Sequence, residues 1–273
     1  MNSTAHTSEL MDQAAGLRNL FVRKQVRFVP VVANPYVARS SVMMEQLCHA
    51  IGNMDLRALV VDASRTAGAS AYQPQRRSRL AAERLAPGLG YLDVSDMAVQ
   101  DAVPAAPAAQ QPAQAFLHEV ASTMPDADVV LVHAAAPDLL HLFSRHRDGG
   151  NAPRFVLLCD ERPPAVTSAY AALKLLATRG GMMAHNLLLS SLRGARVAVA
   201  LSAHLARCAH QFLGALQHHA AWVDPACPDS DANLPAMHRL TEDLLSRAWV
   251  LESPGKTTAA VATPGQPSRA RFF

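Results

Sequence analysis

Arg39 and Ser40 carry a cation and a hydroxyl, the groups with which proteins bind a phosphate and its magnesium ion. They lie in a turn at residues 34–41, which leads from an apolar segment at residues 28–33 into a helical segment. The pair matches the end of the phosphate-loop pattern G-x-x-x-x-G-K-[ST], in which lysine contacts the phosphates and the hydroxyl contacts Mg²⁺. A second apolar segment at residues 56–62 completes a predicted βαβ unit.

The turn lacks the glycines that phosphate binding requires. Glycine lets the backbone adopt a positive φ and brings its N–H groups close to the phosphate oxygens. Pro35 has no N–H to donate, Tyr36 adds bulk, and Ala38 occupies the position of the last glycine. Only Arg39 and Ser40 remain of the pattern, and a surface arginine, exposed or ion-paired, is the simpler interpretation of Arg39.

Apolar segments alternate with amphipathic ones along the chain. This pattern predicts an α/β fold, with a doubly wound, mostly parallel sheet flanked by helices. The expected strands lie at residues 28–33, 56–62, 89–94, 128–133, 154–159, 187–189 and 220–223. The expected helices lie at residues 8–22, 79–85, 113–123, 138–144, 167–178, 195–217 and 234–250, with one more after the turn.

The composition is that of a globular protein with a sizeable core. Half of the 273 residues are hydrophobic, 17% are charged, and the net charge of +3 comes without a dense block of lysine and arginine. We therefore expect no nucleic-acid partner. Four scattered cysteines without CxxC spacing are typical of buried thiols in a reducing cytoplasm. No signal peptide or membrane-spanning apolar run is evident, which favours a cytoplasmic protein.

Three further polar features have structural interpretations. His133 ends an apolar strand, and we expect a hydrogen-bonded histidine at the edge of the core rather than a catalytic base. The twelve histidines, among them His218 and His219, form no set with metal-ligand spacing, so no metal site is predicted. Asp160 and Glu161 follow a predicted strand, where they either bind a partner or cap the next turn with a surface ion pair.

An amphipathic helix is predicted at residues 8–22, within an N-terminal segment of residues 1–25. Ser8 is a suitable N-cap. The apolar residues recur at helical spacing: Leu10, Ala14, Leu17 and Phe21. Gln13 lies at the edge of this apolar stripe, where it can reach a docked partner, whereas Asp12 faces away. A helix packed on its own domain and an arm that binds a partner both fit this pattern.

Residues 12–18, Asp-Gln-Ala-Ala-Gly-Leu-Arg, match the motif D-Q-A-x-x-L-R. With residues 155–176, 187–213 and 221–225, they make the chain similar to the MinD/ParA family of deviant phosphate-loop ATPases. Within that family, the chain resembles the flagellar-number regulators of the FlhG (FleN) type. The resemblance covers most of residues 9–239 and implies a P-loop NTPase-like fold.

The resemblance also implies a degenerate nucleotide site. Six positions of this chain fall on nucleotide-binding residues of the family: Asn34, Arg39, Ser40, Asp62, His133 and Ser190. The two lysines of the family's loop K-G-G-x-G-K-[ST] become Asn34 and Arg39, and the strand-end aspartate of the magnesium shell becomes His133. Ser190 replaces the asparagine that reads adenine. The chain thus resembles a pseudo-ATPase without a cofactor; the alternative is weak residual ATP and Mg²⁺ binding, with hydrolysis.

In the resembled regulators the D-Q-A-x-x-L-R helix contacts FlhF, a GTPase of the signal-recognition type, and stimulates its GTP hydrolysis. The implied partner-binding residues are Asp12, Gln13, Ala14, Leu17 and Arg18. Gln13 is the implied stimulating residue, Leu17 an apolar anchor and Arg18 an ion-pair partner. We expect a non-enzymatic regulator of flagellar assembly and number, which acts by contact with this GTPase or another flagellar regulator. A scaffold of another system, such as cellulose synthesis or cell division, is a less favoured alternative.

The resemblance extends less well to membrane cycling. In the family, nucleotide-driven dimerisation and membrane release need the site that is degenerate here, although a homodimer stays an open alternative. The family's C-terminal amphipathic membrane helix is not evident, because residues 26–250 make up the α/β domain and residues 251–273 form a polar tail, expected to be disordered. We therefore expect a cytoplasmic protein that reaches the cell pole through a partner.

Overall fold

The computed structural model describes residues 25–64, 80–94, 112–143, 152–227 and 233–252. Val26–Leu251 groups as one compact unit. Its strands form one sheet in the order β3-β4-β2-β5-β1-β6-β7-β8, with β9 paired to β1. The strands are β1 Gln25–Val32, β2 Ala58–Ala63, β3 Glu83–Ala86, β4 Leu89–Asp93, β5 Val129–Ala134, β6 Phe155–Asp160, β7 Ala184–Ser190, β8 Leu216–Val223 and β9 Trp249–Glu252.

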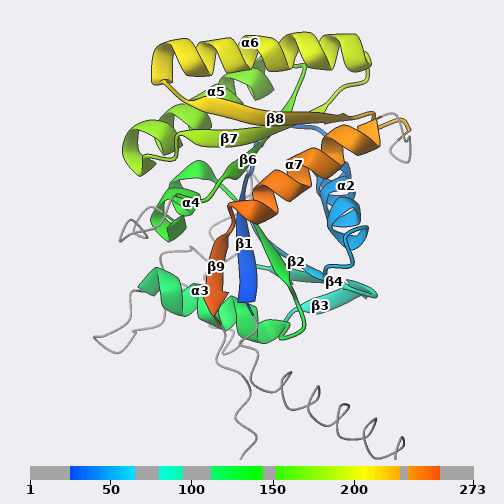
Figure 1. The fold of residues 1–273 in the computed structure, drawn as a ribbon, viewed down its shortest axis with the longest axis vertical. Helices are drawn as coiled ribbons and strands as arrows, with labels where there is room; N and C mark the ends of the chain where they lie inside the picture. The colour runs from blue at the N-terminus through cyan, green and yellow to red at the C-terminus, as the bar shows by residue number, and fades with distance from the viewer. Residues whose placement is uncertain (1–24, 65–79, 95–111, 144–151, 228–232, 253–273) are drawn as a thin grey trace, which may run out of the picture. The chain divides into compact units, whose positions relative to one another are not determined.

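Helices cover both faces of this sheet (Figure 1). They are α2 Ser40–Gly52, α3 Pro112–Thr123, α4 Ala136–Phe143, α5 Pro163–Gly180, α6 Ala195–Leu213 and α7 Leu234–Ser246. Helix α2 packs with α7, whereas α3 packs with α4, α4 with α5 and α5 with α6. The first crossover, from β1 to β2, runs along the sheet in the opposite direction to the four from β4 to β5, β5 to β6, β6 to β7 and β7 to β8, and right-handed crossovers of opposite direction place their helices on opposite faces. The predicted fold class is confirmed.

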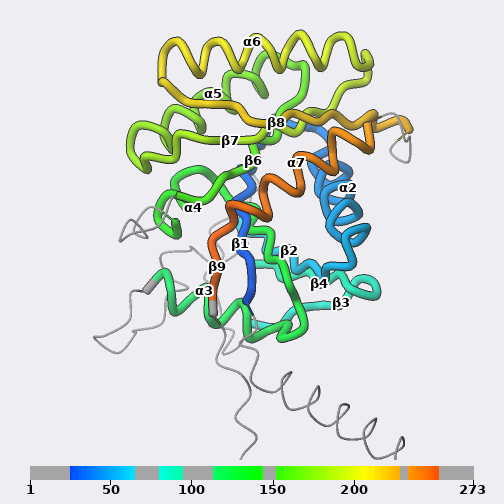
Figure 2. The backbone as a smooth tube through the Cα atoms, in the orientation of Figure 1, coloured from blue at the N-terminus to red at the C-terminus, as the bar shows by residue number. Residues whose placement is uncertain are grey.

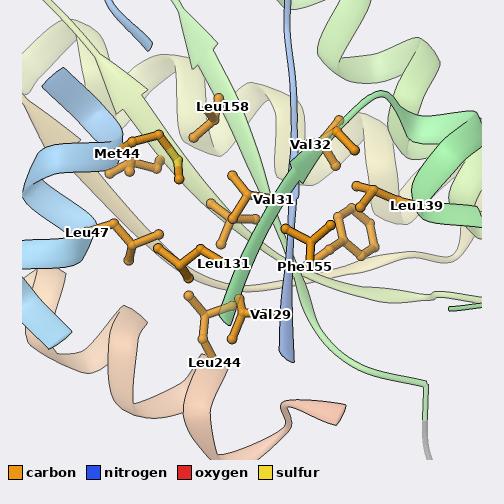
Figure 3. Packing of buried hydrophobic residues seen from close by; sticks show 14 of the residues in the cluster. Val29, Val31, Val32, Met44, Leu47, Leu131, Leu139, Phe155, Leu158 and Leu244 are labelled. Carbon is orange, nitrogen blue, oxygen red and sulfur yellow. The ribbon is translucent and has the colours of Figure 1, made fainter. Parts of the chain in front are cut away.

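The core lies on both faces of the central strands. Every residue of β5 and β6 is buried, as expected for strands of a parallel sheet that has helices on both sides. Figure 3 shows Val29 and Val31 of β1 on the side of α2, near Leu47, and Val32 on the other side, near Leu139 of α4. The strand's alternation of side chains therefore serves two hydrophobic layers.

Some predicted boundaries differ from the structure at prolines and glycines. Helix α5 begins at Pro163 rather than at residue 167, because proline at the first helical positions loses no hydrogen bond. Helix α6 ends at Leu213 rather than at residue 217, because Gly214 adopts the left-handed conformation with a φ of 66°. Strand β8 then begins at Leu216, earlier than the predicted strand at residues 220–223.

Two short strands were not predicted. The helix expected at residues 79–85 is wrong: Glu83–Ala86 is β3, which pairs antiparallel with β4. All four side chains of β3 are exposed, so no apolar pattern marked the strand. The helix expected to reach residue 250 ends at Ser246 and is followed by β9, which extends two residues past the predicted domain boundary. Figure 2 shows β9 beside β1, although the two strands come from opposite ends of the unit.

Two further expectations concern the burial of the cysteines and the absence of membrane-spanning helices. Cys48 and Cys159 are buried, and burial raises the pKa of each thiol to about 12. Cys208 is partly exposed and Cys227 is exposed, so the expectation of buried thiols is right for two of the four cysteines. Within the described ranges, no helix combines the length and the apolar character needed to cross a bilayer.

Candidate functional site

The predicted nucleotide-site residues inside the described ranges lie at the carboxyl edge of the sheet. Asn34 and Arg39 belong to the turn between β1 and α2, and the strands β5 and β6 flank β1 on its two sides. Asp62 and His133 are the penultimate residues of β2 and β5, and Ser190 is the last residue of β7. Connections leave β1 and its neighbours in opposite directions here, which is where open α/β sheets bind ligands.

Asn34 anchors the turn from the inside. Its side chain is buried, and its amide nitrogen donates to the carbonyl oxygens of Leu158 (3.0 Å) and Ala165 (2.9 Å). Its amide oxygen accepts a hydrogen bond from the N–H of Tyr36 (3.2 Å). Both ends of the amide are therefore used within the protein, and the residue ties the turn to β6 and to the start of α5.

Asp160 provides the anion at this turn. It is buried at the end of β6, and its Oδ2 accepts from the backbone N–H of Ala38 (3.3 Å). Arg162 donates its backbone N–H to Oδ1 (3.0 Å), and its Nε (3.0 Å) and Nη2 (2.8 Å) donate to Oδ2. The same guanidinium bonds the carbonyl of Tyr36. The two interpretations left open for Asp160 were partner binding and an ion pair. The structure contains the ion pair, which Asp160 forms with Arg162.

This arrangement occupies the turn with protein groups. In phosphate-binding loops, backbone N–H groups point at an oxyanion of the ligand. Here the N–H of Ala38 points at a carboxylate of the same chain, and the N–H of Tyr36 at the side chain of Asn34. The contacts of Asp160 were not predicted, because they depend on β6 lying beside β1; its place directly after an apolar strand was the available signal.

Arg39 is turned toward the end of another strand. Its guanidinium Nη1 donates to the carbonyl of Pro225 (3.0 Å), which follows β8. The residue is exposed, and it forms no ion pair with any residue that the structure describes. Ser40 begins α2 and is half-buried. The surface interpretation of Arg39 is thus consistent with its contacts, with a backbone carbonyl in place of an anion.

Asp62 and His133 form a second polar group. Asp62 Oδ1 accepts from the N–H (2.9 Å) and the hydroxyl (2.5 Å) of Ser64 and lies 3.2 Å from Nδ1 of His133. The hydroxyl of Tyr91 donates to Oδ2 (3.2 Å). The carboxylate of Asp62 therefore has protein donors on both oxygens.

These contacts determine the charge of Asp62 and the tautomer that a neutral His133 adopts. Burial raises the pKa of Asp62, but the hydrogen bonds from His133 and Ser64 outweigh it and lower the pKa to about 2. Because the ionised carboxylate only accepts, a neutral His133 carries its proton on Nδ1. Its Nε2 is then an acceptor, and this buried atom has no hydrogen-bond partner among the residues that the structure describes. Burial, with the charges of Asp62 and Asp93, raises the pKa of Tyr91 to about 12.

The end of β7 contributes a third contact. Ser190 is buried and lies in register with Asp160 of β6. The following residue, Ser191, donates its hydroxyl to the carboxylate of Glu161 (2.9 Å). Ser190 was predicted from the sequence, whereas Ser191 was not, because its contact depends on the pairing of β6 with β7.

The structure brings only some of the predicted residues together. Asp62 and His133 are in contact and opposite each other in register, whereas Asn34, Arg39 and Ser190 each contact different parts of the chain. Within the described part of the chain, no group of three or more His, Cys, Asp or Glu side chains is placed to hold a metal ion. The predicted partner-binding residues lie outside the described residues: Asp12, Gln13, Ala14, Leu17 and Arg18.

A scan against protein-family models found no match. A search of curated proteins found no relative. Among solved structures, the fold is distantly similar to the MinD cell division protein of Aquifex aeolicus, with a TM-score of 0.47 and 11% identity over 81% of this chain and 96% of that chain. It is also similar to cobyrinic acid a,c-diamide synthase of Mycobacterium smegmatis with bound ADP and magnesium, with a TM-score of 0.45 and 12% identity over 80% and 93%. Similarities at these values carry no information on the activity, ligand or partner of this chain.

Proposed function

We propose that this chain is a non-enzymatic regulator, a pseudo-ATPase that acts by protein contact. The observation that carries the proposal is the carboxylate of Asp160 at the turn between β1 and α2, where it accepts the N–H of Ala38. A nucleotide phosphate at that N–H has to displace a buried carboxylate that Arg162 holds with three hydrogen bonds. The displaced carboxylate and the phosphate have the same sign of charge, so the two repel each other at short range.

Two other features support a closed nucleotide site. Asp62, which the resemblance places among the nucleotide-binding positions, has both oxygens engaged by Ser64, Tyr91 and His133. His133 replaces an acidic residue and offers a lone pair in place of a negative charge. Magnesium prefers oxygen ligands with near-octahedral geometry, and this pair does not offer a free carboxylate oxygen.

The partner half of the proposal rests on the motif at residues 12–18. We infer that this segment binds a signal-recognition-type GTPase of the FlhF class, or another flagellar regulator, and that Gln13 enters the partner's active site. The chain then affects flagellar assembly and number through its contact, in the cytoplasm or at the cell pole where the partner is. Membrane association and a homodimer are not needed for this mechanism.

A GTPase assay tests this function. The full chain is added to a purified FlhF-type GTPase, and phosphate release is measured with the native chain, with Gln13→Ala and with Asn19→Ala as the matched control on the same segment. We expect stimulation by the native chain and the control, and its loss with Gln13→Ala, while binding to the GTPase is retained. No stimulation by the native chain, or full stimulation by Gln13→Ala, would contradict the proposal.

The alternative function is a MinD/ParA-type ATPase with weak ATP binding and hydrolysis. One observation favours it: Ser40 begins α2 with Arg39 beside it, so a hydroxyl and a cation lie at the helix N-terminus, where anions are stabilised. The alternative requires Arg39 to leave the carbonyl of Pro225 and turn to the phosphates. Magnesium-dependent ATP hydrolysis that is lost in Arg39→Ala and Ser40→Ala would establish it in place of the proposal.

A further inference from the structure

A cavity lies at the amino edge of the sheet, opposite the turn between β1 and α2. Its volume is about 290 Å³, close to the lower limit of small-molecule sites, about 300 Å³. The residues that line it lie before or at the start of β6, β7 and β9: Pro153, Arg154, Met182, Met183, Ala184 and Arg247. The cavity therefore uses different residues from the candidate site at the carboxyl edge.

Two arginines meet at this cavity. Arg154 precedes β6, Arg247 follows α7, and the backbone N–H of Arg154 donates to the carbonyl of Arg247 (3.4 Å). The only carboxylate in contact with either side chain, within the described residues, is Asp243, which forms an ion pair with Arg154. Asp243 is also bonded by the amide of Asn186 (2.9 Å). The guanidinium of Arg247 has no hydrogen bond or ion pair to any described residue.

The surrounding groups compensate this positive charge only in part. Burial and the nearby Arg247 lower the pKa of Arg154, and burial, Arg154 and other neighbouring cations lower the pKa of His218. His219 lies 3.9 Å from the carboxylate of Asp243 that already serves Arg154. Groups that repel one another in this way are stabilised by an added anion.

The walls of the cavity indicate what kind of group the ligand carries beside its anion. Met182 is buried and Met183 is partly exposed, and with Pro153 and Ala184 they give the cavity an apolar side. Methionine side chains adapt to different apolar shapes. A ligand that fits therefore has an anionic end and an apolar body.

We propose that this cavity binds a small molecule through a phosphate group held by Arg154 and Arg247, with its apolar part against Met182 and Met183. Guanidinium groups bind oxyanions through parallel N–H donors. A terminal phosphate has three free oxygens and a charge near −2, so it can bond two guanidinium forks at once, whereas a carboxylate offers two oxygens and one negative charge. The pair of arginines therefore selects a phosphate over a carboxylate.

Calorimetry of the full chain with three probes at constant ionic strength tests the proposal. The probes are phenyl phosphate, inorganic phosphate and benzoate, which separate the phosphate group from the apolar body. We expect one site for phenyl phosphate, weaker binding of inorganic phosphate, and benzoate weaker than phenyl phosphate by about tenfold or more. Absence of phenyl phosphate binding, or benzoate binding as tight as phenyl phosphate, overturns the proposal.

Variants locate the site. Arg247→Gln removes an exposed cation that no described residue pairs, and it should weaken phenyl phosphate binding by about tenfold or more. Arg193→Gln removes an exposed arginine at the opposite edge and should leave this binding unchanged. Met183→Ala should weaken phenyl phosphate and leave inorganic phosphate unchanged. Equal binding by the native chain and Arg247→Gln overturns the proposal, because the phosphate then binds elsewhere.

Discussion

Asp160 and Asn34 are the residues that distinguish this turn from a phosphate-binding loop. Each directs a polar side chain at the backbone of residues 36–38, and each is buried. A buried carboxylate is retained in a protein when donors surround it, and Asp160 has four such donor contacts from Ala38 and Arg162. The turn is therefore stabilised in its present form without any ligand.

Replacing Asp160 should destabilise the protein. In Asp160→Ala the N–H of Ala38 and the guanidinium of Arg162 lose their acceptor, although Arg162 is half-exposed and can turn to water. We expect the free energy of unfolding to fall by about 2 kcal/mol, measured by urea denaturation. The neighbouring carboxylate gives the control: Glu161→Ala removes one hydrogen bond from Ser191 and should cost about 1 kcal/mol or less. Equal stability of the native chain and Asp160→Ala would contradict this view of the turn.

Asp62 should make stability depend on pH in the acid range. Its folded pKa of about 2 lies below the unfolded value of about 3.9, so the unfolded state takes up the proton first. The stabilisation is complete above the unfolded pKa and is lost as the pH falls through the folded pKa. Urea denaturation at about pH 5, 4 and 3 should show a smaller loss of unfolding free energy for Asp62→Asn than for the native chain. An equal loss in both would show that Asp62 is not held as an ionised acceptor.

At the scale of elements, long apolar segments were the most predictable part of the fold. The strands at residues 128–133 and 154–159 were predicted to within one residue of β5 and β6, because every side chain in them is buried. Helix ends were less predictable, since Gly214 and Pro163 set them through backbone conformation. Strand β3 has no buried side chain and β9 has four residues, so neither shows a period in the sequence.

The candidate site was predictable as positions but not as contacts. Asp62 and His133 were each identified at the end of a strand, yet their hydrogen bond depends on β2 lying next to β5 with Asp62 opposite His133. The role of Asp160 was left open between two interpretations, because its partner Ala38 is 122 residues away in the sequence. Sheet order, which periodicity does not reveal, supplies these pairs.

Strand β9 should contribute to stability through one face only. The ring of Trp249 lies edge-on to that of Phe28 in β1, with centroids 5.3 Å apart and an interplanar angle of 60°. We expect Trp249→Ala to lower the free energy of unfolding by about 3 kcal/mol, measured by urea denaturation. Val250, the next residue, is 42% exposed, and Val250→Ala should change the free energy of unfolding by less than about 0.5 kcal/mol. Similar costs for both variants would mean that Trp249 does not pack on Phe28 in this way.

At the scale of the whole molecule, the two edges of the sheet have different characters. The carboxyl edge, where open α/β sheets bind ligands, is filled by contacts among Asn34, Asp160 and Arg162. The amino edge has a cavity with two arginines and one carboxylate. Heat from an added nucleotide could therefore come from the cavity with the turn still closed, so a binding experiment has to distinguish the two edges.

The titration of ATP and Mg²⁺ into the full chain by calorimetry tests the closed nucleotide site most directly. It is made with the native chain, with Arg247→Gln to weaken binding at the cavity, and with Arg39→Ala added to Arg247→Gln. We predict that Arg39→Ala leaves the heat from Arg247→Gln unchanged, whatever the native chain shows. A dissociation constant below about 100 μM in Arg247→Gln, corresponding to roughly −5.5 kcal/mol, that is lost when Arg39→Ala is added would contradict this prediction and establish the turn as a nucleotide site.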